Sequence, residues 1–399
     1  MAAPVVDERL ERYAELAIRV GANVQEGQIV FLNVIVEHAP LARALARAAY
    51  RAGARYVDVR YVDNHVRKAM IELGPDEALT HTPEWVKTYG HAIAGQALLG
   101  TSGDPEPELM ADLDGERVGR ARQVAFAEIV RAQMVDRSVN WSGVAYPNEG
   151  WAEQVFGEPD VERLWEAVAF CTRLDEPDPV QAWRDHMARL ERRAAALTER
   201  AFDAIHYSGP GTDLTVGLLP NARWMSALFH TKDGVEYVPN MPTEEIFTAP
   251  DWRRAEGTIR STRPLAVAGD VVEGLQLSVR DGKIVDVEAE KGAAVVRGQL
   301  EIDDRAAYFG ELALVDGTSR VGRTNITFYD TLYDENATCH VAYGFSVTDV
   351  FDEDPGDDVN ASAVHTDFMV GGPELSVDGV TRDGTRVPIL REETWQLPE

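Results

Sequence analysis

A histidine and an aspartate stand two residues apart near the carboxyl end of the chain, in the stretch NASAVHTDFMVGG, where they are His365 and Asp367. Residues two apart in a β-strand point to the same face. If this stretch is a strand, the imidazole and the carboxylate lie side by side. Such a pair is either a hydrogen-bonded couple with mutually tuned pKa values or two ligands of a metal ion. The second alternative requires further ligands elsewhere in the chain.

Three other stretches in the second half of the chain combine acidic residues or histidine with apolar runs. They are YVPNMPTEEIFTAP with Glu244 and Glu245, AYFGELALVD with Glu311, and FYDTLYDENATCHVAYG with Glu335 and His340. The adjacent Glu244 and Glu245 point in opposite directions in an extended segment, so at most one of them enters a shared site. Each stretch alone also has an ordinary explanation, such as an exposed strand end, a helix start or a hydrogen-bonded core histidine.

The elements that carry these residues follow from the hydrophobic periodicity of the chain. Over the first 200 residues or so, strand patterns at 28–36, 56–62, 92–100 and 138–147 alternate with helical patterns at 6–21, 40–54 and 114–136. Strands separated by helices predict βαβ units and a mostly parallel sheet. No GxGxxG or P-loop motif follows a strand, so a nucleotide-binding fold is not indicated.

The second half of the chain has a different pattern. Helices are predicted at 161–174 and 180–200, and short alternating strands follow, among them a hairpin over Asp281 and Gly282. The expected fold class is α/β, with an N-terminal mostly parallel sheet flanked by helices and a C-terminal α+β domain that carries the acidic residues and histidines. The chain of 399 residues is longer than one core usually serves, so we expect domains at 1–205 and 206–399.

Composition restricts the compartment and the partners. The chain has 39 basic and 67 acidic residues and a net charge of −28, and such a surface repels nucleic acid phosphates. No apolar run approaches the length of a membrane span, and the charged N-terminal stretch does not resemble a signal peptide. Two cysteines far apart in the sequence fit a reducing compartment. We expect a cytoplasmic protein without nucleic acid or membrane partners.

Taken together, the four stretches resemble the motifs of the M29 family of metallo-aminopeptidases, the thermophilic-type leucyl aminopeptidases. That family carries P-T-E-E-[VI]-F-T-x-P, a G-E before an apolar run, D-E-N-x-x-x-H and H-x-D-F-M-[IV]-G. This chain has PTEEIFTAP, GELALV, DENATCH and HTDFMVG in the same order. The resemblance extends from YAELAIRVGANVQEGQ to ELSVDG and so covers most of the chain.

The resemblance implies a dinuclear metal site. Carried over position by position, the implied ligands are Glu245, Glu311, Glu335, His340, His365 and Asp367. The expected cofactors are two divalent metal ions, Zn, Co, Mn or Mg. Among these, neutral imidazoles favour the borderline ions Zn, Co and Mn over Ca. Glu311 is expected to bridge the ions, and Glu244 is the candidate general base.

The activity implied by the resemblance is hydrolysis of the N-terminal peptide bond of peptides with a free N-terminus, by a homodimer. Two ions about 3.5–4 Å apart can activate a water molecule and polarise the scissile carbonyl together. Two alternatives remain open at this point. One is a mononuclear-iron ring-opening dioxygenase of related fold, and the other is a metal-binding homologue that is impaired in catalysis.

One position departs from the family pattern. The family usually has a tyrosine seven residues after the histidine of the third motif, where it donates a hydrogen bond to the developing oxyanion, whereas this chain has Val347. Loss of one oxyanion donor lowers the rate by roughly 10²–10³. Tyr343 is the expected substitute. The acidic insert DVFDEDPGDD before the last motif is expected to form a surface loop.

Overall fold

The computed structural model describes residues 7–121, 123–267 and 270–398. They form two compact units: Met1–Arg184 with Leu228–Met241, and Asp185–Ala227 with Pro242–Glu399. The sequence predicts one boundary at 205, whereas the division falls inside helix α10 (Pro179–Arg200) and the segment 228–241 returns to the first unit. In the described part of the chain, no helix is both long and apolar enough to cross a membrane.

The first unit is built on a five-stranded sheet of order β10-β4-β3-β1-β2. Its strands are β1 (Ile29–Ile35), β2 (Tyr56–Val62), β3 (Ala97–Ser102), β4 (Asn140–Ala145) and β10 (Asn240–Met241). Its helices are α1 (Glu8–Leu16), α2 (Ala39–Arg51), α3 (Asn64–Leu73), α4 (Asp76–Thr80), α5 (Glu84–Ala92), α6 (Gly115–Arg120), α7 (Val124–Val135), α8 (Glu149–Phe156) and α9 (Val161–Cys171). All strand pairings in this sheet are parallel, which confirms the expected class.

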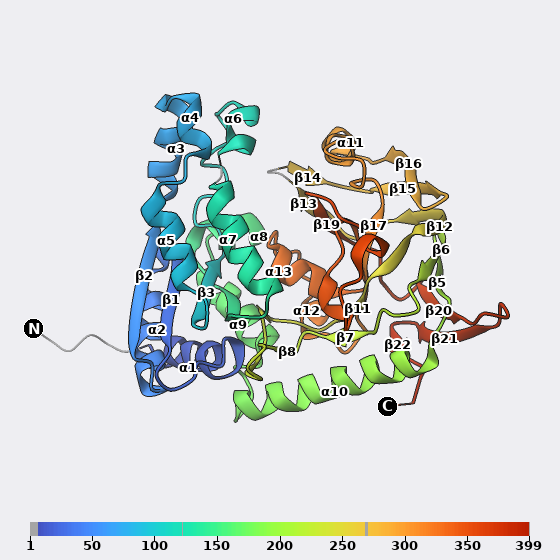
Figure 1. The fold of residues 1–399 in the computed structure, drawn as a ribbon, viewed down its shortest axis with the longest axis horizontal. Helices are drawn as coiled ribbons and strands as arrows, with labels where there is room; N and C mark the ends of the chain where they lie inside the picture. The colour runs from blue at the N-terminus through green and yellow to red at the C-terminus, as the bar shows by residue number, and fades with distance from the viewer. Residues whose placement is uncertain (1–6, 122, 268–269, 399) are drawn as a thin grey trace, which may run out of the picture. The chain divides into compact units, whose positions relative to one another are not determined.

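Helices cover both faces of this sheet. The strand order reverses between β1 and β3, and crossover connections are right-handed, so the connection from β1 to β2 and the one from β2 to β3 lie on opposite faces. Helix α2 packs against β1 and β2. Helices α5 and α7 contact each other over the other face, where Phe31, Ile93 and Val139 form a buried cluster (Figure 1).

Two predicted elements of this unit are wrong in extent. The strand predicted at 92–100 begins only at Ala97, because α5 continues to Ala92 and Gly95 then turns the chain with a φ of 76°. The helix predicted at 114–136 is two helices, α6 and α7. Ala121 ends α6 with a ψ of 75°, outside the helical region.

The second unit is rich in antiparallel strands. One sheet has the order β19-β18-β17-β11-β7, with β7 (Met225–Ser226), β11 (Ile246–Thr248), β17 (Phe309–Leu314), β18 (His340–Gly344) and β19 (His365–Met369). The other has the order β16-β15-β12-β6-β5-β20-β21-β22, with β5 (Ala204–Gly209), β6 (Thr212–Leu218), β12 (Pro250–Arg260), β15 (Gln276–Arg280), β16 (Lys283–Glu288), β20 (Ser376–Val380), β21 (Arg386–Arg391) and β22 (Thr394–Trp395). The hairpin between β15 and β16 turns at Asp281 and Gly282, both with positive φ, as the sequence predicts.

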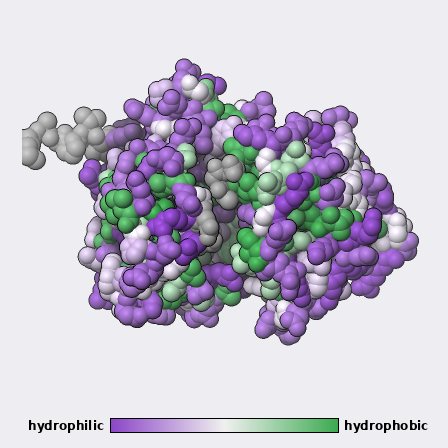
Figure 2. All heavy atoms as spheres, turned by 90° about the horizontal axis from the view of Figure 1, so that it is seen from above, coloured by the Kyte–Doolittle hydropathy of each residue, from purple (hydrophilic) through white to green (hydrophobic). Residues whose placement is uncertain are grey.

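Short elements connect these strands. They are the two-stranded pair β13 (Leu265–Val267) and β14 (Asp270–Val272), the helices α11 (Ala293–Leu300), α12 (Arg320–Thr324) and α13 (Thr331–Asp334), and the 3₁₀ turn η3 (Glu335–Ala337). Another two-stranded pair, β8 (Phe229–His230) and β9 (Glu236–Tyr237), belongs to the first unit. The acidic insert is a surface segment, as expected, because Asp352, Glu353 and Asp354 are exposed. Hydrophilic residues dominate the face drawn in Figure 2, in keeping with the net charge of −28.

Candidate metal centre

Strand alternation gathers four of the predicted ligands on one face of the five-stranded sheet of the second unit. Asp367 of β19 and Glu311 of β17 both stand opposite Ala342 of β18. Directly opposed residues of an antiparallel pair share a face. His340 and His365 lie two residues from Ala342 and Asp367 along their own strands, so they belong to the same face.

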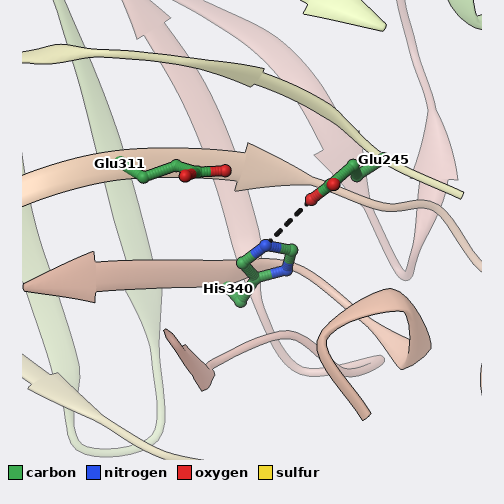
Figure 3. Close-up of side chains that lie close together, drawn as sticks. All are labelled: Glu245, Glu311 and His340. Carbon is green, nitrogen blue, oxygen red and sulfur yellow. Dashed lines mark ion pairs between the residues drawn. The ribbon is translucent and has the colours of Figure 1, made fainter. Parts of the chain in front are cut away.

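Glu245 joins this group from the segment that leads into β11. Phe247 of β11 stands opposite Ala313 of β17, which is two residues after Glu311. Glu245 is two residues before Phe247, and the same alternation aims it at the same face. Figure 3 shows the carboxylates of Glu245 and Glu311 pointing toward each other beside the His340 ring.

The five side chains form two groups that share one member. Ligand atoms of Glu245, Glu311 and His340 lie within 4.8 Å of one another, and so do those of Glu311, His365 and Asp367. His340 Nε2 is 2.9 Å from Glu245 Oε2. His365 Nε2 is 3.4 Å from Glu311 Oε2 and 3.5 Å from Asp367 Oδ2. Glu311 is the member that the two groups share.

Both histidines are oriented as metal ligands usually are. His340 Nδ1 is 3.3 Å from the carbonyl oxygen of Thr338, and His365 Nδ1 is 2.8 Å from that of Phe345. A carbonyl oxygen only accepts, so Nδ1 carries a proton and a neutral ring presents the lone pair of Nε2 to the carboxylates. Lone pairs that face carboxylate oxygens at this range repel one another unless a cation or a proton lies between them.

The donor set fits divalent cations. Glu245 Oε2 is buried without a well-aligned hydrogen-bond donor among the described residues, although His340 Nε2 is near it. Burial raises the pKa of Glu311, and the charges of Asp367 and Glu245 raise it further. Burial lowers the pKa of His340, but the nearby Glu245 carboxylate and the surrounding negative charge outweigh this and raise the pKa to about 10. Without an ion, His340 therefore carries a second proton, on Nε2, and a metal ion that binds there must displace it.

Glu335, the sixth predicted ligand, belongs to neither group. It is half-buried at the first position of η3, a turn that packs against β19. Burial raises its pKa well above the ordinary value, and the charges of Asp367 and Glu245 act in the same direction. Its carboxylate is therefore close enough to interact electrostatically with the cluster.

Glu244, the predicted general base, has partners other than those of Glu245. Its Oε1 accepts a hydrogen bond from the backbone N–H of Arg320 at 3.3 Å, and its Oε2 is 3.5 Å from His186 Nε2. Its own N–H donates to Asn336 Oδ1 at 2.7 Å. This agrees with the expectation that at most one of the two adjacent glutamates enters the cluster. No motif in the sequence points to His186, which lies within α10, whereas Asn336 stands inside the DENATCH motif.

Tyr343 does not replace the missing tyrosine. It stands opposite Thr366, three residues after His340 on β18, and alternation therefore sends its side chain to the other face of the sheet. There its hydroxyl donates to Gln299 Oε1 at 2.5 Å. The expectation that Tyr343 supplies an oxyanion donor is therefore wrong.

Gly310 permits the close approach of β17 and β18 that positions Glu311. The register between these strands shifts between Phe309 and Glu311. A Cβ on Gly310 would lie 2.3 Å from the carbonyl oxygen of Phe345 and 2.4 Å from that of Gly344, a distance no side chain tolerates. This close packing explains why the G-E motif has a glycine at position 310.

The chain is similar over nearly its whole length to known proteins. The model of a family described as thermophilic metalloprotease (M29) matches residues 6–395. Aminopeptidase T of Thermus aquaticus is 41% identical over 406 residues, covering 98% of this chain and 99% of the relative. Aminopeptidase 2 of Geobacillus stearothermophilus is 38% identical, covering 98% of each. The solved structure of wild-type AmpT from Thermus thermophilus matches with a TM-score of 0.90 and 39% identity, covering 98% of this chain and 99% of that one.

Proposed function

The chain belongs to the thermophilic metalloprotease family M29 and is a metallo-aminopeptidase, and from this premise we propose that it removes N-terminal residues from peptides at a dinuclear metal centre. The observation that carries the proposal is the membership of Glu311 in both ligand groups. We assign one divalent ion to the group with Glu245 and His340 and a second to the group with His365 and Asp367. Glu311 is the proposed bridge.

The donor set determines which ions suit the site. With Glu335 as a fourth carboxylate, the ionised acidic ligands carry a total charge equal and opposite to that of two divalent ions. The two imidazoles favour the borderline ions Zn, Co or Mn. The alternative is Mg, a hard ion that binds through the carboxylates. Bound ions would supply Lewis acidity for the scissile carbonyl and a water of lowered pKa.

The residues of the chain hold and orient this chemistry. Three neighbouring strands fix the spacing of the ligands, and the hydrogen bonds from Nδ1 to backbone carbonyls keep Nε2 of His340 and His365 facing the carboxylates. We assign proton transfer to the leaving amine to Glu244, whose side chain must leave its contacts with Arg320 and His186 to do so. Glu244→Gln should then lower kcat by about 10²–10⁴ while the metal content stays unchanged. An unchanged kcat would remove Glu244 from this role.

The proposal also covers the oligomeric state and the cellular compartment of the protein. We propose a homodimer in the cytoplasm that acts on peptides with a free N-terminus. Both cysteines are free and buried, which supports a reducing compartment. Light scattering should give twice the chain mass of 44.0 kDa, and a value equal to the chain mass would contradict the dimer.

The comparisons favour a hydrolase over the ring-opening dioxygenase, so we propose no second function. A single iron needs two histidines and one carboxylate, whereas here the ligand atoms form two groups. The metal content separates these alternatives. About two ions per chain supports the peptidase, and about one supports the dioxygenase.

Activity is tested on the purified chain after it has been stripped of metal and reloaded with Zn, Co or Mn. We expect it to hydrolyse Leu-p-nitroanilide and to release the first residue of short peptides. The same peptides with an acetylated N-terminus are the matched control and should resist cleavage. No turnover of any aminoacyl substrate by the loaded chain would support the catalytically impaired homologue instead.

A further inference from the structure

A cavity of about 270 Å³ lies in the first unit, on the sheet face that α5 and α7 cover. Its lining comes from the strands β1, β3 and β4 and from the two helices, and it is mainly apolar. All of its lining residues belong to the first unit, whereas the predicted ligands of the metal centre all belong to the second.

The cavity exists because one row of the sheet lacks large side chains. Asn33 of β1 stands opposite Gly100 of β3, and Gly100 stands opposite Gly143 of β4. A Cβ on Gly100 would have no atom within 4 Å, and a Cβ on Gly143 would meet only the carbonyl oxygen of Pro239, at 3.8 Å. The two glycines therefore leave room that a side chain would otherwise fill.

This row crosses the point at which the strand order reverses. Strands β1 and β3 are neighbours whose connections leave toward opposite faces, and in open parallel sheets ligands bind at such a point, near the carboxyl ends of the strands. Asn33 and Gly100 both lie in the carboxyl-terminal halves of their strands.

The walls of the cavity are aromatic. The rings of Tyr89 and Phe126 stand with their centroids 6.4 Å apart at an interplanar angle of 33°, and Trp141 lines the cavity from β4. Flat rings pack well against aromatic side chains. These surfaces favour a planar, largely apolar ligand.

Asn33 adds one polar group to this surface. It interrupts the apolar strand IVFLNVI, its side chain is exposed, and it makes no side-chain hydrogen bond among the described residues. An amide in the middle of a strand brings a hydrogen-bond acceptor and donor to the cavity without any internal partner to satisfy them.

We propose that this cavity binds a planar bicyclic aromatic ring with one N–H group, of the indole type, and that Asn33 Oδ1 accepts the hydrogen bond from that N–H. A cavity of roughly 150 Å³ holds benzene, so the larger volume here leaves room for a second fused ring. The ring reaches the cavity either as a free small molecule or as the tryptophan side chain of a peptide.

Calorimetric titration of the metal-loaded full chain with indole tests the proposal. We expect a Kd of about 1 mM or lower. Gly100→Val fills the cavity at a position where a Cβ meets nothing, so it should weaken indole binding at least about tenfold and leave the melting temperature and the peptidase activity unchanged. Gly298→Val is the matched control. It lies on the exposed surface of α11, where a Cβ also meets nothing, and should leave indole binding unchanged.

The role of Asn33 has its own test. Benzothiophene has the shape of indole without the N–H, so the wild-type chain should bind indole several-fold more tightly, and Asn33→Leu should abolish this preference. N-acetyl-tryptophan amide and a tripeptide with central tryptophan identify the source: binding as tight as that of indole supports a peptide side chain, and binding of indole alone supports a free small molecule. No indole binding up to about 5 mM, or equal binding by Gly100→Val, would overturn the proposal.

Discussion

Glu311 connects the two ligand groups, and its replacement is the most informative change of a single residue. Glu311→Gln keeps the shape of the side chain and removes the charge, so the metal content should fall from about two per chain to one or fewer and kcat/KM should fall at least about 100-fold. Elemental analysis and Leu-p-nitroanilide turnover measure both. Glu301→Gln, at an exposed position just after α11, is the matched control and should change neither. Full metal content in Glu311→Gln would contradict the bridge.

A substitution of Val347 is expected to increase the activity. Val347 is half-buried, it follows His340 by seven residues, and its side chain cannot donate a hydrogen bond. Val347→Tyr should raise kcat, by up to roughly 10²–10³, because it restores a donor for the developing oxyanion. Val347→Phe adds the ring without the hydroxyl, and an equal gain in that variant would show that the hydroxyl is not responsible.

At the scale of elements, the contact between β17 and β18 decides whether the ligands converge. Gly310→Ala forces a Cβ against two carbonyl oxygens, so it should lower the free energy of unfolding by about 1–3 kcal/mol and weaken metal binding by displacing Glu311. Urea unfolding and metal titration measure these effects. Gly298→Ala on α11, where the Cβ is unobstructed, should cause neither loss. Unchanged metal affinity in Gly310→Ala would show that the bulge does not position Glu311.

A second test at this scale concerns the 3₁₀ turn η2 (Val36–His38), which follows β1. His38 Nε2 is 3.0 Å from the carbonyl oxygen of Gly103, its Nδ1 is 2.9 Å from Thr101 Oγ1, and burial lowers its pKa from 6.5 to about 4. Between these pH values the unfolded chain binds a proton that the native chain does not, so stability falls as the pH drops.

From pH 7 to pH 5 this single group should lower the free energy of unfolding by about 2 kcal/mol. Urea unfolding at both pH values measures the difference, and His38→Gln should lose that part of the pH dependence. An identical dependence in the variant and the wild-type chain would show that His38 is not held neutral by the fold.

The elements that the sequence predicted well are those with a strong local period. Alternation alone places His365 and Asp367 on one face of β19, and the hairpin at Asp281 and Gly282 follows from the turn residues themselves. Local patterns carry less information where backbone geometry interrupts them, as at Ala121 between α6 and α7. Strand alternation also predicts that the Tyr343 side chain lies on the face opposite to His340. This holds only if β18 continues to Gly344 without a bulge, which the structure shows.

For the molecule as a whole, the pairing of strands far apart in the sequence was the part of the fold that local patterns could not predict. The short strand β10 comes from the segment 228–241, far along the chain from its partner β4, and no local pattern indicates that it completes the parallel sheet. The convergence of five of the six predicted ligands was predictable because family motifs in a fixed order substitute for this missing long-range information. The sequence does not reveal the bulge at Gly310 or the position of Glu335 outside both ligand groups. Both became visible only in the structure.

The proposed metal centre and the proposed indole site draw their residues from different units. All six predicted metal ligands lie between Glu245 and Asp367, within the second unit, whereas the aromatic cavity belongs to the first. Metal removal should therefore abolish peptidase activity and leave the binding of indole unchanged. If metal removal abolished indole binding as well as peptidase activity, the two proposed sites would not be independent.

Anomalous diffraction from crystals of the Zn-loaded chain, recorded at the zinc absorption edge, tests the dinuclear centre most directly. We expect two peaks about 3.5–4 Å apart, one beside Glu245 and His340 and the other beside His365 and Asp367, with the Glu311 carboxylate between them. A single peak, or peaks away from Glu311, would contradict the dinuclear centre.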